Sequence, residues 1–285
     1  MKSFYVVTNT AKDTDYSLTN SVVKYLEQKG CYCGFVPFAR GFIPGEDKYV
    51  DPAMIPEDVE AIIVLGGDGT LLQAARDTYS RSIPIIGVNL GDMGYLTDIS
   101  EGDVFSALDA LIEDRFFIEK RMMLKGTLYS GGARVMSNIA LNDIVISKSY
   151  DQRMIKLNIN VDDSFLNTIY ADGLIMSSPT GSTGYSLSVG GPIIAPDAEA
   201  LLITPLAPHT LANRSVVLSG ESKITIEQGT NKDGASGDAI VVFDGNIKSM
   251  MHTGDKVEIE KSETDVKLIK IYKSSFLDVL SMKMR

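Results

Sequence analysis

Hydrophobic positions in the first part of the chain follow two different periods. Short apolar runs such as "FYVVT" and "AIIVL" predict strands that are buried on both faces of a parallel sheet. Between these runs, "SLTNSVVKYLEQKG" places Leu18, Val22 and Leu26 on one helical face and ends at Gly30, a helix stop signal. "IPIIGV" predicts a further strand, and "DVFSALDALIEDRF" predicts a further helix. This alternation of strand and helix predicts an α/β domain.

From about residue 120 the apolar positions alternate with polar ones instead. "RMMLKGTLYSGGARVMSNIALNDIVISK" and "RMIKLNINVDDSFLNTIYADGLIMSS" each predict strands around a tight turn, and short alternating stretches such as "KITIEQ" and "KVEIEK" follow. We therefore predict an α/β domain over residues 1–119 and an all-β domain over residues 120–264. The last segment, residues 265–285, contains "FLDVLSMKM", a predicted short helix that we expect to pack back on the first domain. Residues 40–57 carry prolines and charges without a clear period, and we interpret them as a surface loop.

Charge and cysteine content narrow the classes of function. The chain has 285 residues, with 27 basic and 37 acidic side chains and a net charge of -10, which disfavours a nucleic-acid partner but not a small anionic ligand. Its two cysteines, Cys31 and Cys33, are poorly spaced for a disulfide and too few for a structural zinc site. The sequence shows neither a membrane span nor the apolar core of a signal peptide. We expect a cytoplasmic protein without a membrane partner.

The stretch "VLGGDGTLL", residues 64–72, joins a predicted strand to a predicted helix. Its glycines, Gly66, Gly67 and Gly69, would let a phosphate approach the backbone at the helix N-terminus, with Thr70 as the expected N-cap. Asp68 stands among them, although its charge repels a phosphate. The alternative interpretation is an Asp-Gly hairpin, which is disfavoured because the segment that follows has a helical period.

A second informative stretch covers residues 172–192, "DGLIMSSPTGSTGYSLSVGGP". A strand runs into a loop rich in hydroxyl groups, which can bind a polyol or a nucleobase edge through neutral hydrogen bonds. A Ser/Thr-rich turn that caps a helix explains the same residues, so this stretch alone leaves both interpretations open.

Several motifs together resemble NAD kinases in order and spacing. They are "GGDGT" at 66–70, "LND" at 141–143, "DGLIMSSPTGSTGYSLSVGGPI" from 172, "PHTLANR" from 208 and "FDG" at 243–245. The resemblance implies a Rossmann-like α/β N-terminal domain and a β-sandwich-like C-terminal domain. It implies phosphoryl transfer from ATP or polyphosphate to the 2'-hydroxyl of the adenosine ribose of NAD, which yields NADP. It also implies a homo-oligomer, dimer or tetramer, and a divalent cation, Mg, that the nucleotide phosphates carry in place of a dedicated protein metal site.

The resemblance also assigns roles to individual residues. Asp68 is implied to be the catalytic carboxylate, which orients the ribose hydroxyl and accepts its proton. The implied phosphate-donor loop is Gly66, Gly67, Gly69 and Thr70. The implied substrate-binding residues are Gly67, Gly69, Tyr95, Asn142, Asp143, Asp172, Ser178, Thr183, Gly184, Tyr185, Ser188 and Asp244.

Some of these positions keep a structural alternative. Asn142 and Asp143 also suit a turn between strands, Asp244 suits an Asp-Gly hairpin, and Tyr95 suits ordinary packing under a loop. Asp143 is shorter than the glutamate of many NAD kinases. Gly184 replaces a frequent alanine, and this replacement leaves the preference between NAD and NADH open. Two alternative functions remain: a lipid kinase that shares the GGDGT loop, and a dinucleotide sensor that has lost catalysis.

Overall fold

The computed structural model describes residues 1–38, 50–91, 94–149, 154–209, 214–230, 237–272 and 276–284. The chain forms two compact units. The first comprises Met1–Arg121 and Thr264–Arg285, and the second comprises Met122–Glu263. Within the described residues, no helix is long and apolar enough to cross a membrane.

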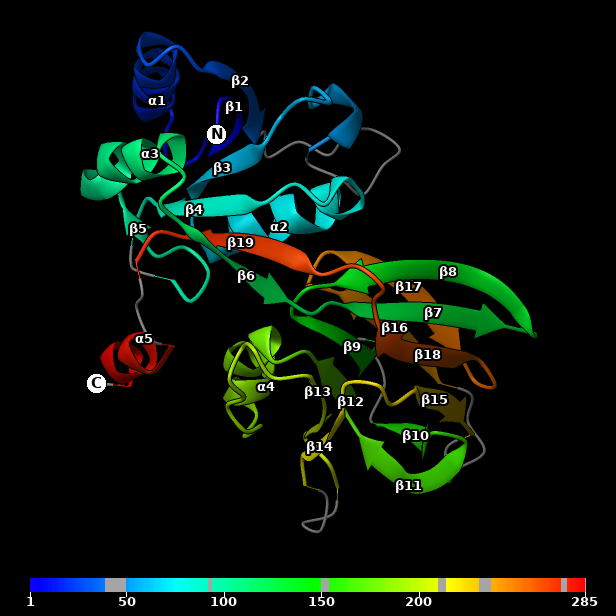
Figure 1. Ribbon diagram of the computed structural model, residues 1–285. Helices are drawn as coiled ribbons and strands as arrows, with labels where there is room; N and C mark the ends of the chain where they lie inside the picture. Colours follow the sequence, from blue (N-terminus) through cyan, green and yellow to red (C-terminus); the bar gives the residue numbers. More distant parts are fainter. Residues whose placement is uncertain are drawn as a thin grey trace. The chain divides into compact units, whose positions relative to one another are not determined.

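The first unit is built on a seven-stranded sheet (Figure 1). Its strands are β1 (Ser3–Asn9), β2 (Tyr32–Phe38), β3 (Ala61–Gly66), β4 (Ile85–Asn89), β5 (Ile99–Ser100), β6 (Phe117–Arg121) and β19 (Val266–Lys270). The order is β2-β1-β3-β4-β19-β6, with β5 paired to β4. The strands β1 to β4 pair in parallel, as the apolar runs predict, and β5 and β19 also pair in parallel with β4. Among the described pairs, only β6 is antiparallel to its neighbour, β19. The carboxyl ends of β1, β3 and β4 therefore lie side by side.

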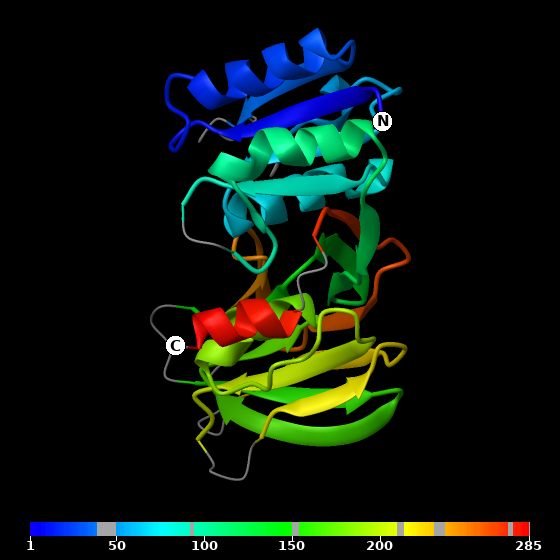
Figure 2. The same ribbon diagram turned by 60° about the vertical axis from the view of Figure 1, so that its left-hand side comes forward.

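Helices cover both faces of this sheet (Figure 2). On one face, α1 (Ser17–Gln28) and α3 (Val104–Ile112) bury Val22, Leu26 and Leu108 against alternate strand residues. On the other face lies α2 (Asp68–Thr78), whose Leu71 approaches Gly87 so closely that a Cβ there would lie 2.6 Å from Leu71 Cδ1. The remaining helical segments are η1 (Pro52–Met54), η2 (Tyr79–Arg81), η3 (Glu101–Asp103) and α5 (Phe276–Lys283).

The second unit contains two six-stranded antiparallel sheets, with orders β11-β10-β15-β18-β7-β8 and β14-β13-β12-β9-β16-β17. The strands are β7 (Leu124–Ser130), β8 (Ala133–Ala140), β9 (Asp143–Lys148), β10 (Ile155–Val161), β11 (Ser164–Ala171), β12 (Gly173–Ser177), β13 (Ala200–Leu206), β14 (Val216–Ser219), β15 (Ile224–Gly229), β16 (Asp238–Phe243), β17 (Ile247–His252) and β18 (Lys256–Lys261). Side chains of both sheets form one apolar core. The predicted fold class, an α/β domain followed by a β-sandwich-like domain, is thus confirmed.

The turn residues explain the hairpins of this unit. The "SGG" turn between β7 and β8 uses Gly131 and Gly132 at φ 56° and 83°, and the "DD" turn between β10 and β11 uses Asp162 and Asp163 at φ 49° and 63°. Two successive residues with positive φ are what a tight two-residue hairpin of matching twist requires.

The predicted surface loop at residues 40–57 is only partly described, because residues 39–49 lie outside the described part. Where its backbone is described, the prediction is wrong at two positions: Val50 is 1% exposed and Ile55 is 2% exposed. The Val50 amide also donates to Asp77 Oδ2 at 3.0 Å. Irregular backbone with prolines can still place single apolar side chains in a core, and such side chains leave no periodic signal.

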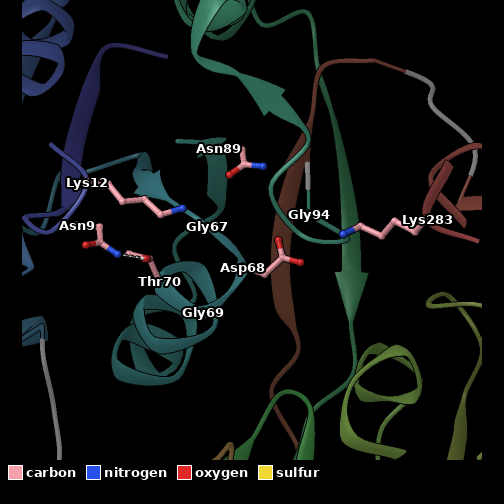
Figure 3. A pocket seen from close by; sticks show the side chains of 9 residues that line it. All are labelled: Asn9, Lys12, Gly67, Asp68, Gly69, Thr70, Asn89, Gly94 and Lys283. Atoms are coloured by element: carbon pink, nitrogen blue, oxygen red, sulfur yellow. Dashed lines mark hydrogen bonds between the residues drawn. The ribbon is translucent and has the colours of Figure 1, made fainter. Parts of the chain in front are cut away.

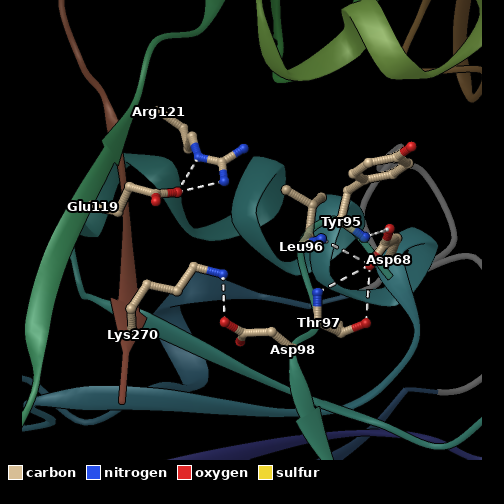
Figure 4. Close-up of polar contacts among 8 residues, drawn as sticks. All are labelled: Asp68, Tyr95, Leu96, Thr97, Asp98, Glu119, Arg121 and Lys270. Carbon is tan, nitrogen blue, oxygen red and sulfur yellow. Dashed lines mark hydrogen bonds and ion pairs between the residues drawn. The ribbon is translucent and has the colours of Figure 1, made fainter. Parts of the chain in front are cut away.

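A buried ion pair connects β19 to the loop before β5 (Figure 4). Lys270 Nζ lies 3.0 Å from Asp98 Oδ2, and the two side chains are only 9% and 10% exposed. Removing one partner of such a pair leaves an uncompensated buried charge, which is far more harmful than losing an exposed pair.

We therefore expect Lys270→Met to lower the free energy of unfolding by roughly 3–5 kcal/mol. The variant keeps the apolar stem and removes only the ammonium group. Urea unfolding of the full chain measures the loss. The control is Lys125→Met, whose pair with Glu260 at 3.3 Å is 40% and 45% exposed; there the loss should stay below about 1 kcal/mol. Equal losses in the two variants would contradict a larger role for the buried pair than for the exposed one.

Candidate functional site

The glycine-rich loop begins where β3 ends at Gly66. Gly67 is the N-cap of α2 in an extended conformation, with φ -124° and ψ -172°, and α2 begins at Asp68. The prediction that Thr70 caps this helix is wrong, because Thr70 already lies in its first turn, with its amide donating to Gly67 O at 2.9 Å. The Thr70 hydroxyl accepts a hydrogen bond from Asn9 Nδ2 at 2.9 Å instead. A Cβ on Gly66 would lie 2.5 Å from that hydroxyl oxygen, so this position requires glycine.

Asp68 holds the loop that precedes β5 (Figure 4). Its Oδ1 accepts hydrogen bonds from the Leu96 amide at 3.1 Å, the Thr97 amide at 3.0 Å and Thr97 Oγ1 at 2.9 Å. Its Oδ2 accepts from the Tyr95 amide at 2.7 Å. Hydrogen bonds to a charged group stabilise by roughly 1.5–3 kcal/mol each, so this carboxylate is a strong anchor for residues 95–97. A carboxylate oxygen has two lone pairs, and Oδ2 therefore keeps acceptor capacity that Oδ1 has used.

Two neighbours complete this contact. A Cβ on Gly94 would lie 1.8 Å from Asp68 Oδ1, so only glycine lets the loop close over the carboxylate. Tyr95 packs with its ring centroid 6.3 Å from that of Phe276, and Lys283 Nζ lies 5.0 Å from the Tyr95 centroid. Burial, followed by the charge of Asp68, raises the pKa of Tyr95. The packing interpretation of Tyr95 thus holds, and a ligand role for it stays a prediction.

Asp68, Gly94 and Lys283 border a cavity of about 510 Å³ in the first unit (Figure 3). It is lined by Asn9, Lys12, Gly67, Asp68, Gly69, Thr70, Asn89, Gly94 and Lys283. Of the residues predicted to form the phosphate-donor loop, Gly67, Gly69 and Thr70 line this cavity. Asn9, Lys12 and Asn89 are cavity residues that no sequence motif predicts. A signal was present, since these polar residues follow or end predicted strands, and the carboxyl ends of parallel strands are where such sheets bind ligands.

In the second unit, Asp244 organises the turn that contains Asn142. Its Oδ2 accepts from the Leu141 amide at 2.8 Å, and its Oδ1 accepts from the amides of Asn142 and Asp143 at 2.8 and 3.1 Å. Asp244 also has a positive φ of 46° and turns β16 into β17. The structural interpretations of the Asn142 turn and the Asp244 hairpin are therefore both correct, and the structure brings these predicted residues together.

The loop after β12 packs against the same turn. Ser178 donates its amide to Asn142 O at 2.9 Å, and its hydroxyl donates to Leu141 O at 2.5 Å. A Cβ on Gly181 would lie 2.1 Å from Asn142 O, and a Cβ on Gly184 would lie 3.8 Å from Asn142 Nδ2. The hydroxyl-rich stretch thus forms η4 (Thr180–Thr183) and α4 (Tyr185–Ser188) directly beside the turn.

The other predicted residues of this stretch differ in their surroundings. The Thr183 hydroxyl donates to Thr180 O at 3.2 Å, and the Ser188 hydroxyl donates to Gly184 O at 3.5 Å, so both bond to the backbone of their own turn. The Tyr185 side chain is 44% exposed. Asp172 lies at the opposite end of β12 and forms an ion pair with Lys148 at 2.8 Å. A five-residue strand separates Asp172 from Ser178, so the structure does not bring Asp172 to the Asn142 turn.

Asp143 is the one strongly perturbed carboxyl group among the described residues of this cluster. It is 7% exposed, and its carboxyl group has no hydrogen bond to a described residue. Burial, together with the neighbouring charge of Asp244, raises the pKa of Asp143 to about 7. Perturbed carboxyl groups concentrate at functional sites, and a ligand-binding role for Asp143 stays a prediction.

Metal ligands do not cluster in the part of the chain that the structure describes. No group of three or more His, Cys, Asp or Glu side chains there is arranged to hold a metal ion.

The fold and the cavity in the first unit define a class of protein. A glycine-rich loop between a parallel strand and a helix N-terminus, with a cavity at the carboxyl edge of the sheet, places the chain among α/β proteins that bind phosphorylated ligands at this edge. Two family models match: the ATP-NAD kinase N-terminal domain over residues 4–116, and the ATP-NAD kinase C-terminal domain over residues 141–271. The chain belongs to the NAD kinase family.

Relatives and solved structures agree with this assignment. The NAD kinase of Agathobacter rectalis is 41% identical over 100% of this chain and 99% of its own length, and that of Lachnospira eligens is 40% identical over 100% of both. The NAD kinase of Archaeoglobus fulgidus, solved in complex with ATP, has a TM-score of 0.76 and 26% identity over 98% of this chain and 97% of its own. Yeast NADH kinase complexed with NADH shares the fold, with a TM-score of 0.84 and 20% identity over 100% of this chain and 87% of its own.

The raised pKa of Asp143 predicts a pH dependence of stability. An unfolded chain has a pKa near 3.8 for this group, whereas the folded value is about 7, so the folded protein binds the proton more tightly. The contribution of the protonated Asp143 carboxyl group to the free energy of unfolding is therefore full at low pH. It is lost as pH rises between about pH 4 and 7, by up to roughly 1.4 kcal/mol per pH unit.

We expect Asp143→Asn to remove this loss, so that its stability relative to the unmodified protein increases from about pH 5 to about pH 7.5. Urea unfolding across this range measures the difference. Asp163→Asn, in the exposed turn between β10 and β11, is the control and should follow the unmodified protein. Parallel stability curves for the Asp143 variant would show that this group does not titrate in that range.

Proposed function

We propose that this protein transfers the γ-phosphoryl group of ATP, or a phosphoryl group of polyphosphate, to the 2'-hydroxyl of the adenosine ribose of NAD. The hydroxyl oxygen attacks the γ-phosphorus, the bond from that phosphorus to the bridging oxygen breaks, and ADP leaves. Asp68 accepts the hydroxyl proton, and the products are NADP and ADP.

The observation that carries this proposal is the hydrogen bonding of Asp68. Three donors hold Oδ1, whereas only the Tyr95 amide donates to Oδ2. The carboxylate is thereby fixed at the cavity. Its Oδ2 can accept a hydrogen bond from a further donor, such as a ribose hydroxyl. Positioned proton transfer contributes about 10² to 10⁴ in rate, so most of the acceleration has to come from positioning and from neutralising phosphate charge.

The remaining roles follow the family resemblance. Gly66, Gly67, Gly69 and Thr70 would offer backbone to the donor phosphates. In the second unit, the cluster around Asn142, together with the other predicted binding residues, would bind NAD. Mg would enter on the nucleotide phosphates and supply charge neutralisation there. We further propose a cytoplasmic homo-oligomer, dimer or tetramer.

The first test is incubation of the purified protein with NAD, ATP and magnesium, with NADP read by an NADP-specific coupled dehydrogenase. We expect NADP to form. NADH as acceptor and polyphosphate as donor then define the preferences. If NAD binds but neither donor gives product from NAD or NADH, the protein is a dinucleotide sensor, and failure to bind NAD at all points to a lipid kinase.

We expect Asp68→Asn to reduce turnover by at least about 10², the smaller effect typical of losing a positioned base. An amide keeps one acceptor oxygen for Leu96 and Thr97 but cannot take up the hydroxyl proton, so NAD should still bind in a direct titration. The loop-anchoring role needs its own control, Thr97→Val, which removes one donor to Oδ1 and leaves the carboxylate. Its loss of turnover should be much smaller. Near-normal turnover in the Asp68 variant would refute the base role, and equal losses in both variants would assign the effect to the loop.

A further inference from the structure

Lys12 is a basic residue of the first cavity that none of the family motifs contains. It lies in a tight turn directly after β1, where the amides of Lys12 and Asp13 both donate to Asn9 O at 2.9 and 3.0 Å. The buried Asp13 carboxylate accepts from the amides of Leu18 and Thr19 at 3.2 and 2.9 Å. The turn is thus held both by the end of β1 and by the first turn of α1, so the backbone that carries Lys12 is fixed.

The ammonium group of Lys12 faces bare backbone (Figure 3). A Cβ on Gly67 would lie 3.3 Å from Lys12 Nζ, and a Cβ on Gly91 would lie 3.2 Å from it. Within the described part of the chain, no hydrogen bond or ion pair engages this ammonium group. Lys283 lines the same cavity, but its Nζ lies over the Tyr95 ring, 5.0 Å from the centroid. Among the described residues, the exposed ammonium group of Lys12 therefore has no ionic partner beside the glycine-rich loop.

Lys12 and Asp68 stand at the same cavity without pairing. No ion pair joins these two described residues, and the Asp68 carboxylate is occupied by the amides of Tyr95, Leu96 and Thr97. In a chain with a net charge of -10, an ammonium group that pairs with no described residue and lies beside a helix N-terminus is a local site for an anion. The two charges remain available for opposite tasks, with the carboxylate for a hydroxyl proton and the ammonium for phosphate oxygens.

We propose that Lys12 binds the phosphate chain of the donor and neutralises charge on the phosphoryl group as it is transferred. This inference rests on the proposed function. Phosphoryl transfer depends mainly on such positioning and neutralisation, and a lysine ammonium acts as a compact point charge on phosphate. Gly67 and Gly91 lack side chains where a Cβ would crowd this ammonium group.

The test compares Lys12→Met, which keeps the stem and removes the charge, with Lys24→Met, an exposed position on α1. We expect the Lys12 variant to lower kcat/KM for ATP by about 10- to 100-fold, the loss of one charge-assisted hydrogen bond. KM for NAD should change less than about twofold, because Lys12 is proposed to contact the phosphate donor and not NAD. Lys12→Arg should recover much of the loss, and Lys24→Met should match the unmodified protein.

A binding measurement separates this inference from the proposed function. Calorimetric titration with inorganic tripolyphosphate should give weaker binding for Lys12→Met than for the unmodified protein, whereas adenosine should bind both alike. If the unmodified protein makes no NADP, the proposed function fails, and the tripolyphosphate comparison still decides the role of Lys12. Unchanged ATP kinetics and unchanged tripolyphosphate binding overturn the inference. A rise confined to KM for NAD overturns the assignment to the donor.

Discussion

The contact between the Asp68 carboxylate and the backbone amides of residues 95–97 is the interaction on which the first cavity depends. It joins two loops that are 27 to 29 residues apart in sequence. Gly94 has to lack a side chain because of it, since a Cβ there would lie 1.8 Å from Oδ1. Asp98, which directly follows residues 95–97, forms an ion pair with Lys270 on β19. A residue expected to do chemistry is thus also the residue that builds the wall of its own cavity.

The distribution of donors over the two carboxylate oxygens reconciles these tasks. Oδ1 takes three hydrogen bonds and serves as the anchor, while Oδ2 takes one and stays able to accept another. Fixing the group in this way removes the side-chain freedom that a base would otherwise lose on reaching the transition state. It also engages the carboxylate with backbone amides, and no ion pair joins the described residues Asp68 and Lys12. The aspartate that seemed misplaced in a phosphate loop is therefore compatible with an anion bound beside it.

The sequence predicts most of the architecture because its periods are clear. The apolar runs of β1, β3 and β4, the helical face of α1 and the turn residues at 131–132 and 162–163 all correspond to observed elements. The Thr70 side chain suits a cap, but the structure places Gly67 in that position and begins the helix at Asp68. Lys12 could not be assigned, since its distance from Gly67 depends on β1 lying next to β3 in the sheet, which periodicity does not determine.

Asp244 repeats in the second unit what Asp68 does in the first. Each carboxylate accepts hydrogen bonds from three consecutive backbone amides, those of residues 95–97 and of residues 141–143. The consequences differ, because Asp244 places its charge beside a buried Asp143 and helps to raise the pKa of that group to about 7. In both places a residue that the family resemblance assigns to a ligand also holds a turn in shape. Truncating either aspartate to alanine would remove both roles at once, so only isosteric changes, compared with variants of the donors, can separate ligand contact from architecture.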